Sequence, residues 1–397
     1  MTRLRVAPVS GTGGSHQRGF ALVAAVFALV IIAAMVAGGY FIAAQQLRVA
    51  GAGPQASSAL YSAEAGLSAM LAGWDPVWAD STEPGATVGL MADQLVSGDG
   101  YEVRLTRLDT GLDQRAAYYL ASAIGRAHGP RGGRRQIALF LRVGRFAGLC
   151  CEAALSAMGP VRVATGAVVQ GSDVLPGGWQ SVAPGCQGLG PGAEAGILGE
   201  ALERVVVAAG AVVEGEPPVA EIGRAGSDPL ADFDTWYWEL EQRADVRYAG
   251  GIELPDIAPA VGTDGACDES APGNWGAPAD PGHPCFGHLP IIYVGGDLRI
   301  RSPGRGQGIL LVDGDLELGG DFDFYGIVAV RGRLVSGEGG GRVHGGLLAR
   351  NAGLDTVRVG AGTELTYSRC AVQRALQSPK LHLPQPLADF AWFEILE

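Results

Sequence analysis

The chain has 397 residues, enough for about two or three domains, and it combines 47% hydrophobic with 18% charged residues. This composition is too apolar for a disordered chain, and its 63 glycines follow no collagen-like period. The net charge of −12 argues against nucleic acid and anionic membrane surfaces as partners of the outer part of the chain.

The first predicted element is an apolar segment between Arg18 and Arg48 that contains no charged residue. About 20 apolar residues suffice to cross the hydrocarbon core, and they do so as a helix because lipid offers the backbone no other hydrogen-bond partner. The first 19 residues are basic, and the first acidic residue is Glu64. This asymmetry predicts a single-pass inner-membrane protein with a cytoplasmic N-terminus and a periplasmic or extracellular bulk.

Three interpretations of this segment compete. A cleaved secretory signal would have an apolar region of about 7–15 residues, whereas this one continues past Ala37. An uncut signal anchor is the second. The third is a prepilin, in which a basic leader (1–19) ends at Gly19 and the helix starts at Phe20. The segment QRGFALV at 17–23, followed by LYSAEAGL at 60–67, resembles the N-terminal domain of PilX-type minor pilins and the related K-type minor pseudopilins of type II secretion.

The resemblance implies cleavage between Gly19 and Phe20 by a prepilin peptidase and N-methylation of Phe20. It also implies contact with other pilins through the N-terminal helix. Major pilins carry a glutamate four residues after the new N-terminus, where this chain has Ala24. This departure puts repeated self-polymerisation in doubt and fits a rare or tip-located subunit.

The pilin-like helix is predicted over 20–75, with a kink or break at 51–54 because Pro54 removes a backbone hydrogen bond. Residues 76–147 are predicted as a loop with a short helical piece (76–98) and an antiparallel β meander. The meander's strands are expected at 101–105, 118–124 and 136–143, with glycine-rich turns at Gly111 and 129–133. A basic cluster, with Arg131, Arg134 and Arg135, is interpreted as a solvated hairpin rim or a contact for another subunit.

Residues 148–383 are predicted to form a glycine-rich parallel β-solenoid. The segment VRVATGAVVQG at 161–171 recurs as VVVAAGAVVEG at 205–215, with eight of eleven positions identical. Further along, an 18-residue period relates Ile292, Leu310 and Val328, and also Leu298, Leu316 and Leu334. Apolar positions alternate within each copy, which indicates strands stacked once per coil with glycine at the corners. Residues 343–359 are expected to add a fourth coil. The predicted fold is therefore mainly β with one long N-terminal helix.

Three further pieces accompany the solenoid. DFDTWYWELEQR at 232–243 predicts a helix across it, capped by an aspartate, with Phe233, Trp236, Tyr237 and Leu240 on one face. Residues 255–290 are expected to form a proline-rich loop. The tail 384–397, with Phe390, Trp392 and Phe393, is expected to fold back and cap an end of the solenoid, because an uncapped end exposes strand edges.

All six cysteines follow the membrane segment, and an oxidising compartment would let them pair. Cys267 with Cys285 is the favoured pair, since it would hold the proline-rich loop. Cys186 could reach Cys150 or Cys151, leaving Cys370 for the other. A zinc site of Cys267, His283, Cys285 and His288 is a further possibility, but its spacing matches no standard zinc finger.

No nucleophile elbow, phosphate-binding loop or zinc-protease helix is present, so we expect no catalytic residues and no cofactor. Asp297 and Asp315 occupy equivalent positions of successive coils, with Asp313, Asp321 and Asp323 nearby. Such rows serve catalysis or structural calcium in some β-helices. Solvated turn aspartates are the simpler interpretation, because Arg333 occupies the third equivalent position.

Two functional classes remain. The favoured one is a minor pilin-like subunit that is processed by prepilin peptidase and acts in assembly initiation or at the tip of a type IV pilus or type II secretion filament, with an exposed, adhesive head. The alternative is a membrane-anchored β-helix enzyme or polysaccharide-binding protein with an uncut N-terminus. The sequence does not separate pilus from secretion filament, name a surface ligand or fix the disulfide pairing.

Overall fold

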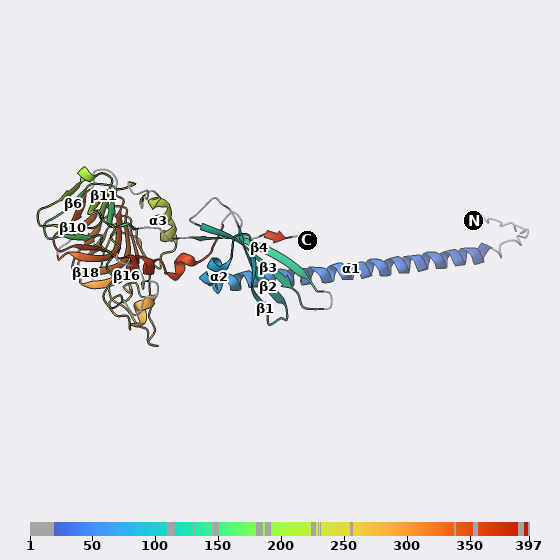
Figure 1. Ribbon diagram of the computed structural model, residues 1–397. Coiled ribbons are helices and arrows are strands. Elements are labelled where there is room, and N and C mark those ends of the chain that lie inside the picture. The colour runs from blue at the N-terminus through green and yellow to red at the C-terminus, as the bar shows by residue number, and fades with distance from the viewer. Residues whose placement is uncertain are drawn as a thin grey trace, which may run out of the picture. The chain divides into compact units, whose positions relative to one another are not determined.

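Figure 1 shows the computed structural model of the chain. It describes all residues except 1–19, 109–115, 130–131, 145, 147–150, 180–185, 187–191, 224–227, 229, 231, 255–256, 337–338, 352–355, 388–392 and 396–397, and only the backbone of 20–24, 43–52 and 79–80. The chain divides into two compact units. We call them the helix–sheet unit (Met1–Thr110, Tyr118–Arg142 and Gln385–Glu397) and the parallel-strand unit (Gly111–Ala117 and Val143–Pro384).

The helix–sheet unit begins with α1 (Phe20–Ala72), which ends where the sequence predicts. The predicted break at 51–54 is wrong, because α1 continues through Pro54. A proline removes a single hydrogen bond, and the helix is long on both sides of this one. A short helix, α2 (Pro76–Ser81), follows, with the Asp75 side chain accepting a hydrogen bond from the amide of Val77 at its start.

An antiparallel sheet packs on the outer half of α1. Its strands are β1 (Thr87–Gln94), β2 (Gly100–Leu108), β3 (Ala116–Arg126), β4 (Arg134–Gly144), β23 (Gln385–Pro386) and β24 (Phe393–Ile395), in the order β1-β2-β3-β4-β23 with β24 also on β4. The three predicted meander strands are present. The prediction of a loop over 76–98 missed β1, an edge strand whose residues are mostly exposed and therefore alternate weakly.

Small residues set the distance between α1 and this sheet. Ala59, Ala63 and Met70 are fully buried on the helix face. A Cβ added to Gly125 of β3 would lie 1.9 Å from the carbonyl oxygen of Ala59. The sheet therefore touches the helix backbone itself, a distance that only glycine permits.

The C-terminal tail belongs to this unit, so the prediction that it caps a solenoid end is wrong. β23 and β24 pair antiparallel with β4, and the rings of Phe393 and Phe140 lie 5.5 Å apart. These two strands of the tail pair with the edge of β4 instead. The backbone amides and carbonyls of an edge strand need hydrogen-bond partners there as they do at the end of a solenoid. Phe390 and Trp392 lie outside the described residues.

The parallel-strand unit contains the remaining elements, which Figure 1 labels in part. They are β5 (Ala153–Ala157), β6 (Val161–Val163), β7 (Val168–Gln170), β8 (Ala195–Gly199), η2 (Leu202–Arg204), β9 (Val205–Val207), β10 (Val212–Glu214), β11 (Val219–Glu221), α3 (Phe233–Gln242), β12 (Val246–Tyr248), β13 (Ile252–Leu254), η3 (Pro284–Gly287), β14 (Ile291–Val294), β15 (Leu298–Ile300), β16 (Gly304–Val312), β17 (Leu316–Leu318), β18 (Phe322–Val330), β19 (Leu334–Ser336), β20 (Gly341–Ala349), β21 (Val357–Val359), β22 (Glu364–Tyr367), α4 (Arg369–Ala375) and η4 (Pro379–His382).

The predicted pairing of residues 18 apart is confirmed. Ile292 pairs in parallel with Leu310 and Leu310 with Val328, while Leu298, Leu316 and Leu334 do the same in a second sheet. The first sheet has 11 strands and the second has seven, and both are parallel along their main paths. β20 and β21 extend the stack, as expected of residues 343–359. The inward residues of both sheets, together with Phe233, Trp236, Tyr237 and Leu240 of α3, form one hydrophobic core.

A glycine ladder runs through the middle of β16, β18 and β20. Gly308, Gly326 and Gly345 pair in register and all have positive φ, at 102°, 137° and 148°. A Cβ on Gly345 would lie 1.9 Å from the carbonyl oxygen of Gly326. Any other residue would strain the backbone and separate the strands.

The order of the strands in the stack differs from their order in the sequence. The seven-stranded sheet runs β13-β15-β17-β19-β21-β6-β9, so the first segment, β6, lies beside the last, β21. The two related segments at 161–171 and 205–215 therefore continue the stack beyond its C-terminal strands. β12 and β13 form its opposite end.

Candidate functional site

The N-terminal half of α1, which we call its inner half, carries an uncovered apolar surface, and the C-terminal half is called its outer half. Residues 25–42 have a mean hydropathy of 2.5, and none of them is buried. Val26, Phe27, Leu29 and Ile32 are each more than half exposed and point in different directions around the helix, so apolar side chains lie on every side of it. Such a segment is long and apolar enough to cross a membrane, and an apolar surface all round suits a lipid environment. We therefore identify it as a candidate membrane anchor.

A buried carboxylate ties the outer half of α1 to the sheet. Asp99 accepts hydrogen bonds from the Ser58 hydroxyl of α1 at 2.6 Å, from the Ser97 hydroxyl at 2.8 Å and from the backbone amide of His128 at 2.6 Å. The hydrogen bond from Ser58, followed by that from His128, lowers the pKa of Asp99. These bonds favour the charged carboxylate, which therefore joins the helix to two loops of the sheet.

The residues of the pilin resemblance fall in two places. Gly19 and the leader lie outside the described residues, and Phe20 is the first residue of α1. The segment around Glu64 lies on the outer half, where a Cβ on Gly66 would meet the ring of Tyr101 at 2.8 Å. The small residues of the 60–67 segment thus serve packing between α1 and β2.

The disulfides correct one expectation. Cys267 is joined to Cys285, the favoured pair, across the proline-rich loop. Cys186 pairs with Cys370, 184 residues away, and not with Cys150 or Cys151. Folding brings these two together beside Trp179 and Phe286, a proximity that sequence separation does not reveal. Cys151 is also disulfide-bonded, and Cys150 lies outside the described residues.

The zinc interpretation is wrong, because two of its four ligands form a disulfide. The Nδ1 atom of His283 accepts a hydrogen bond from the amide of Cys285 at the start of η3. His288 is buried beside this loop, and its Nδ1 lies 3.9 Å from the carboxylate of Glu269.

The aspartate row holds neighbouring strand layers together. Asp297 accepts a hydrogen bond from the amide of Asp315 at 2.9 Å, and Asp315 accepts from the amide and the side chain of Arg333 at 3.1 and 2.8 Å. Asp313 accepts from Tyr293 and Arg331, and the buried Asp323 pairs with Arg305 and Arg342. Across the described ranges, no three His, Cys, Asp or Glu residues are grouped to hold a metal ion.

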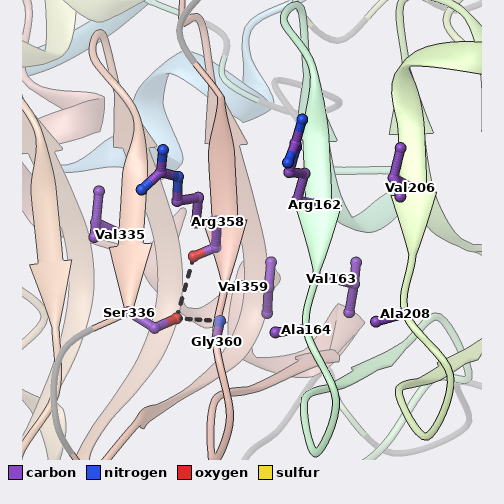
Figure 2. Close-up of a pocket in the computed structure, with 10 residues that line it drawn as sticks. All are labelled: Arg162, Val163, Ala164, Val206, Ala208, Val335, Ser336, Arg358, Val359 and Gly360. Atoms are coloured by element: carbon purple, nitrogen blue, oxygen red, sulfur yellow. Dashed lines mark hydrogen bonds between the residues drawn. The ribbon is translucent and has the colours of Figure 1, made fainter.

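A hollow of about 520 Å³ opens on the outer face of the seven-stranded sheet. Figure 2 shows its lining on four neighbouring strands, with Val335, Arg358, Arg162 and Val206 in one row. The pairing registers place these four residues side by side on β19, β21, β6 and β9. Ser336 lies at the edge, where its hydroxyl accepts from the Gly360 amide and donates to the Arg358 carbonyl.

This hollow was not predicted from the sequence, although the sequence contains a signal for it. The tripeptide Val-Arg-Val occurs at both 161–163 and 357–359. Each copy turns its arginine outward between two buried valines. Only the stacking of β6 on β21 makes these two arginines neighbours.

The chain matches no family model, and no curated protein is similar to it in sequence. Among solved structures it is similar to the competence-associated pilin ComZ from Thermus thermophilus, at 14% identity and a TM-score of 0.26. The match covers 87% of this chain and 98% of the other. A likeness at this level does not establish a shared fold.

Proposed function

We propose that this chain is a minor pilin-like subunit of a type IV pilus or type II secretion filament. One observation carries the proposal: α1 is a single 53-residue helix whose inner half is apolar and uncovered and whose outer half packs on an antiparallel sheet. A membrane span has no need of such an extension. A subunit that must hold a head outside the membrane while its helix docks beside others does need it.

In this proposal prepilin peptidase cuts between Gly19 and Phe20 on the cytoplasmic side, and Phe20 is then N-methylated. The basic leader and the apolar segment support this orientation. Ala24 leaves the new N-terminus without the carboxylate that major pilins supply. The subunit therefore acts at the start or tip of a filament and is not its repeating unit.

The parallel-strand unit is the exposed, adhesive head, and we interpret it as a β-solenoid. Parallel registers at intervals of 18 and 19 residues and the glycine ladder support this interpretation. The head acts by binding and not by catalysis, and it needs no cofactor, since its aspartates are already engaged between strand layers. The Cys186–Cys370 and Cys267–Cys285 disulfides suit an oxidising compartment.

The test is the N-terminal mass of the protein extracted from membranes of cells that contain prepilin peptidase. We expect a chain that starts at Phe20 and carries one additional methyl group. Gly19→Leu should leave the leader in place, whereas Gly14→Leu, a matched change within the leader, should still be cut. An intact Met1, or a cut after Ala37, in the unaltered protein would reject the proposal and favour the membrane-anchored binding protein.

A further inference from the structure

The outer face of the seven-stranded sheet carries a row of residues whose charges are balanced at one end only. In pairing order the row is Glu253, Arg299, Glu317, Val335, Arg358, Arg162 and Val206. At its balanced end, Glu317 lies 3.4 Å from Arg299 and 3.2 Å from Arg301, and Glu253 lies 3.5 Å from Arg301.

At the other end, the paired positions of the row hold two cations and no acidic residue. Arg358 and Arg162 are exposed and pair directly across β21 and β6. Within the described part of the chain, neither guanidinium has an ion-pair or hydrogen-bond partner. Neighbouring strands lie about 4.8 Å apart, so the stems of two like charges are held close by the backbone. In a protein of net charge −12, two adjacent exposed arginines that have no partner among the described residues form a candidate site for an anion.

The surroundings of this pair suit a ligand larger than a single inorganic ion. The hollow has a volume of about 520 Å³, which lies within the usual range of small-molecule sites. Val335 and Val206 flank the arginines and offer apolar contact on both sides (Figure 2). Guanidinium groups bind carboxylates through two parallel hydrogen bonds, and an apolar rim strengthens those bonds by limiting water.

We propose that this hollow binds an acidic polysaccharide, with uronate carboxylates on Arg162 and Arg358 and sugar faces against the two valines. A hollow that spans four neighbouring strands suits a chain that passes across them. The inference deepens the adhesive role in the proposed function and depends on it for its biological setting. Binding by the purified chain nevertheless does not depend on leader cleavage, so the two proposals can fail separately.

The experiment measures binding of oligogalacturonate to the full-length protein in detergent micelles by isothermal titration calorimetry. We expect saturable binding that weakens with added salt, and no binding of a neutral galactan of the same length. The double variant Arg162→Gln with Arg358→Gln should weaken binding by about tenfold or more. The matched control is Arg299→Gln, which removes an exposed arginine of the same row that already has a carboxylate partner, and it should change binding by less than about twofold.

A variant with Arg162→Lys and Arg358→Lys, which keeps both positive charges, controls for the case in which the glutamine pair loses binding because it fails to fold. It should bind more tightly than the glutamine pair and more weakly than the natural chain. The proposal is overturned if oligogalacturonate does not bind, or if the glutamine pair binds as the natural chain does. It is equally overturned if polyglutamate or duplex DNA binds as tightly, since the hollow would then take an acidic peptide or any polyanion.

Discussion

Gly125 offers the sharpest test of how α1 is held by its sheet. In Gly125→Ala the new Cβ would lie 1.9 Å from the carbonyl oxygen of Ala59 and 2.6 Å from the amide nitrogen of Ala63. Contacts below 3.0 Å essentially do not occur for real Cβ atoms. The helix backbone would therefore have to retreat by about 1 Å, and Ala59 and Ala63 would lose contact with the sheet.

Overpacking of this kind costs about 1–3 kcal/mol, which changes the ratio of folded to unfolded molecules by roughly 5- to 150-fold. The measurement is hydrogen–deuterium exchange of the full-length protein in detergent micelles, read at the amides of β3 and of residues 55–70. We expect faster exchange in both segments and unchanged exchange in β16 and β18, which belong to the parallel-strand unit.

Gly89 on β1 of the same sheet is the matched control, because a Cβ there would meet nothing within 4 Å. Gly89→Ala should leave exchange unchanged or slow it slightly, since alanine restricts the unfolded chain. If Gly125→Ala exchanges like the natural protein, the close approach of β3 to the helix is not what holds this unit together.

Three further outcomes are expected. The folded state lowers the pKa of Asp99 below its value of 3.8 in the unfolded chain, so the stability that the Asp99 carboxylate contributes is present above pH 3.8 and is lost as pH falls through the lowered pKa. Asp99→Asn should therefore flatten the acid dependence of the free energy of unfolding measured across pH 2–6. An unchanged profile would exclude the stabilising link between Asp99 and Ser58. Replacing Cys186 and Cys370 by serine should lower the free energy of unfolding of the parallel-strand unit by about 2–5 kcal/mol, measured from denaturant midpoints. A reducing agent should therefore destabilise the variant less than it destabilises the natural protein. Leu310→Ala, in the core, should cost about 2–5 kcal/mol, whereas the exposed Val206→Ala should cost under about 0.5 kcal/mol; equal costs would contradict the assigned inward and outward faces.

The regular parts of this fold could be predicted because their causes are local. A strand that buries alternate residues shows alternation, and layers of equal length show a period, so the pairing of Ile292 with Leu310 was accessible from spacing alone. The helix at 233–242 followed from its aromatic face in the same way. β1 was not predicted, because a mostly exposed edge strand buries too few side chains to produce an alternation of apolar and polar residues.

Two features at the candidate sites could not be predicted from the sequence, because they depend on contacts between distant segments. The Cys186–Cys370 bond and the contact of β6 with β21 each join segments nearly 200 residues apart. No local pattern records which strand will lie next to a given strand. Consequently the hollow with Arg162 and Arg358 could not be located before the stack was assembled.

By itself, the sequence determined the apolar segment that is a candidate membrane anchor, the long helix beyond it and the pairing of residues 18 apart, since each depends on residue type and spacing along the chain. The tertiary structure alone decided that the first strand layer follows the last, that strands of the tail pair with β4, and that two exposed arginines meet on one face. Those outcomes depend on which free edges and apolar surfaces remain once the local elements exist, and this is a property of the whole assembled chain.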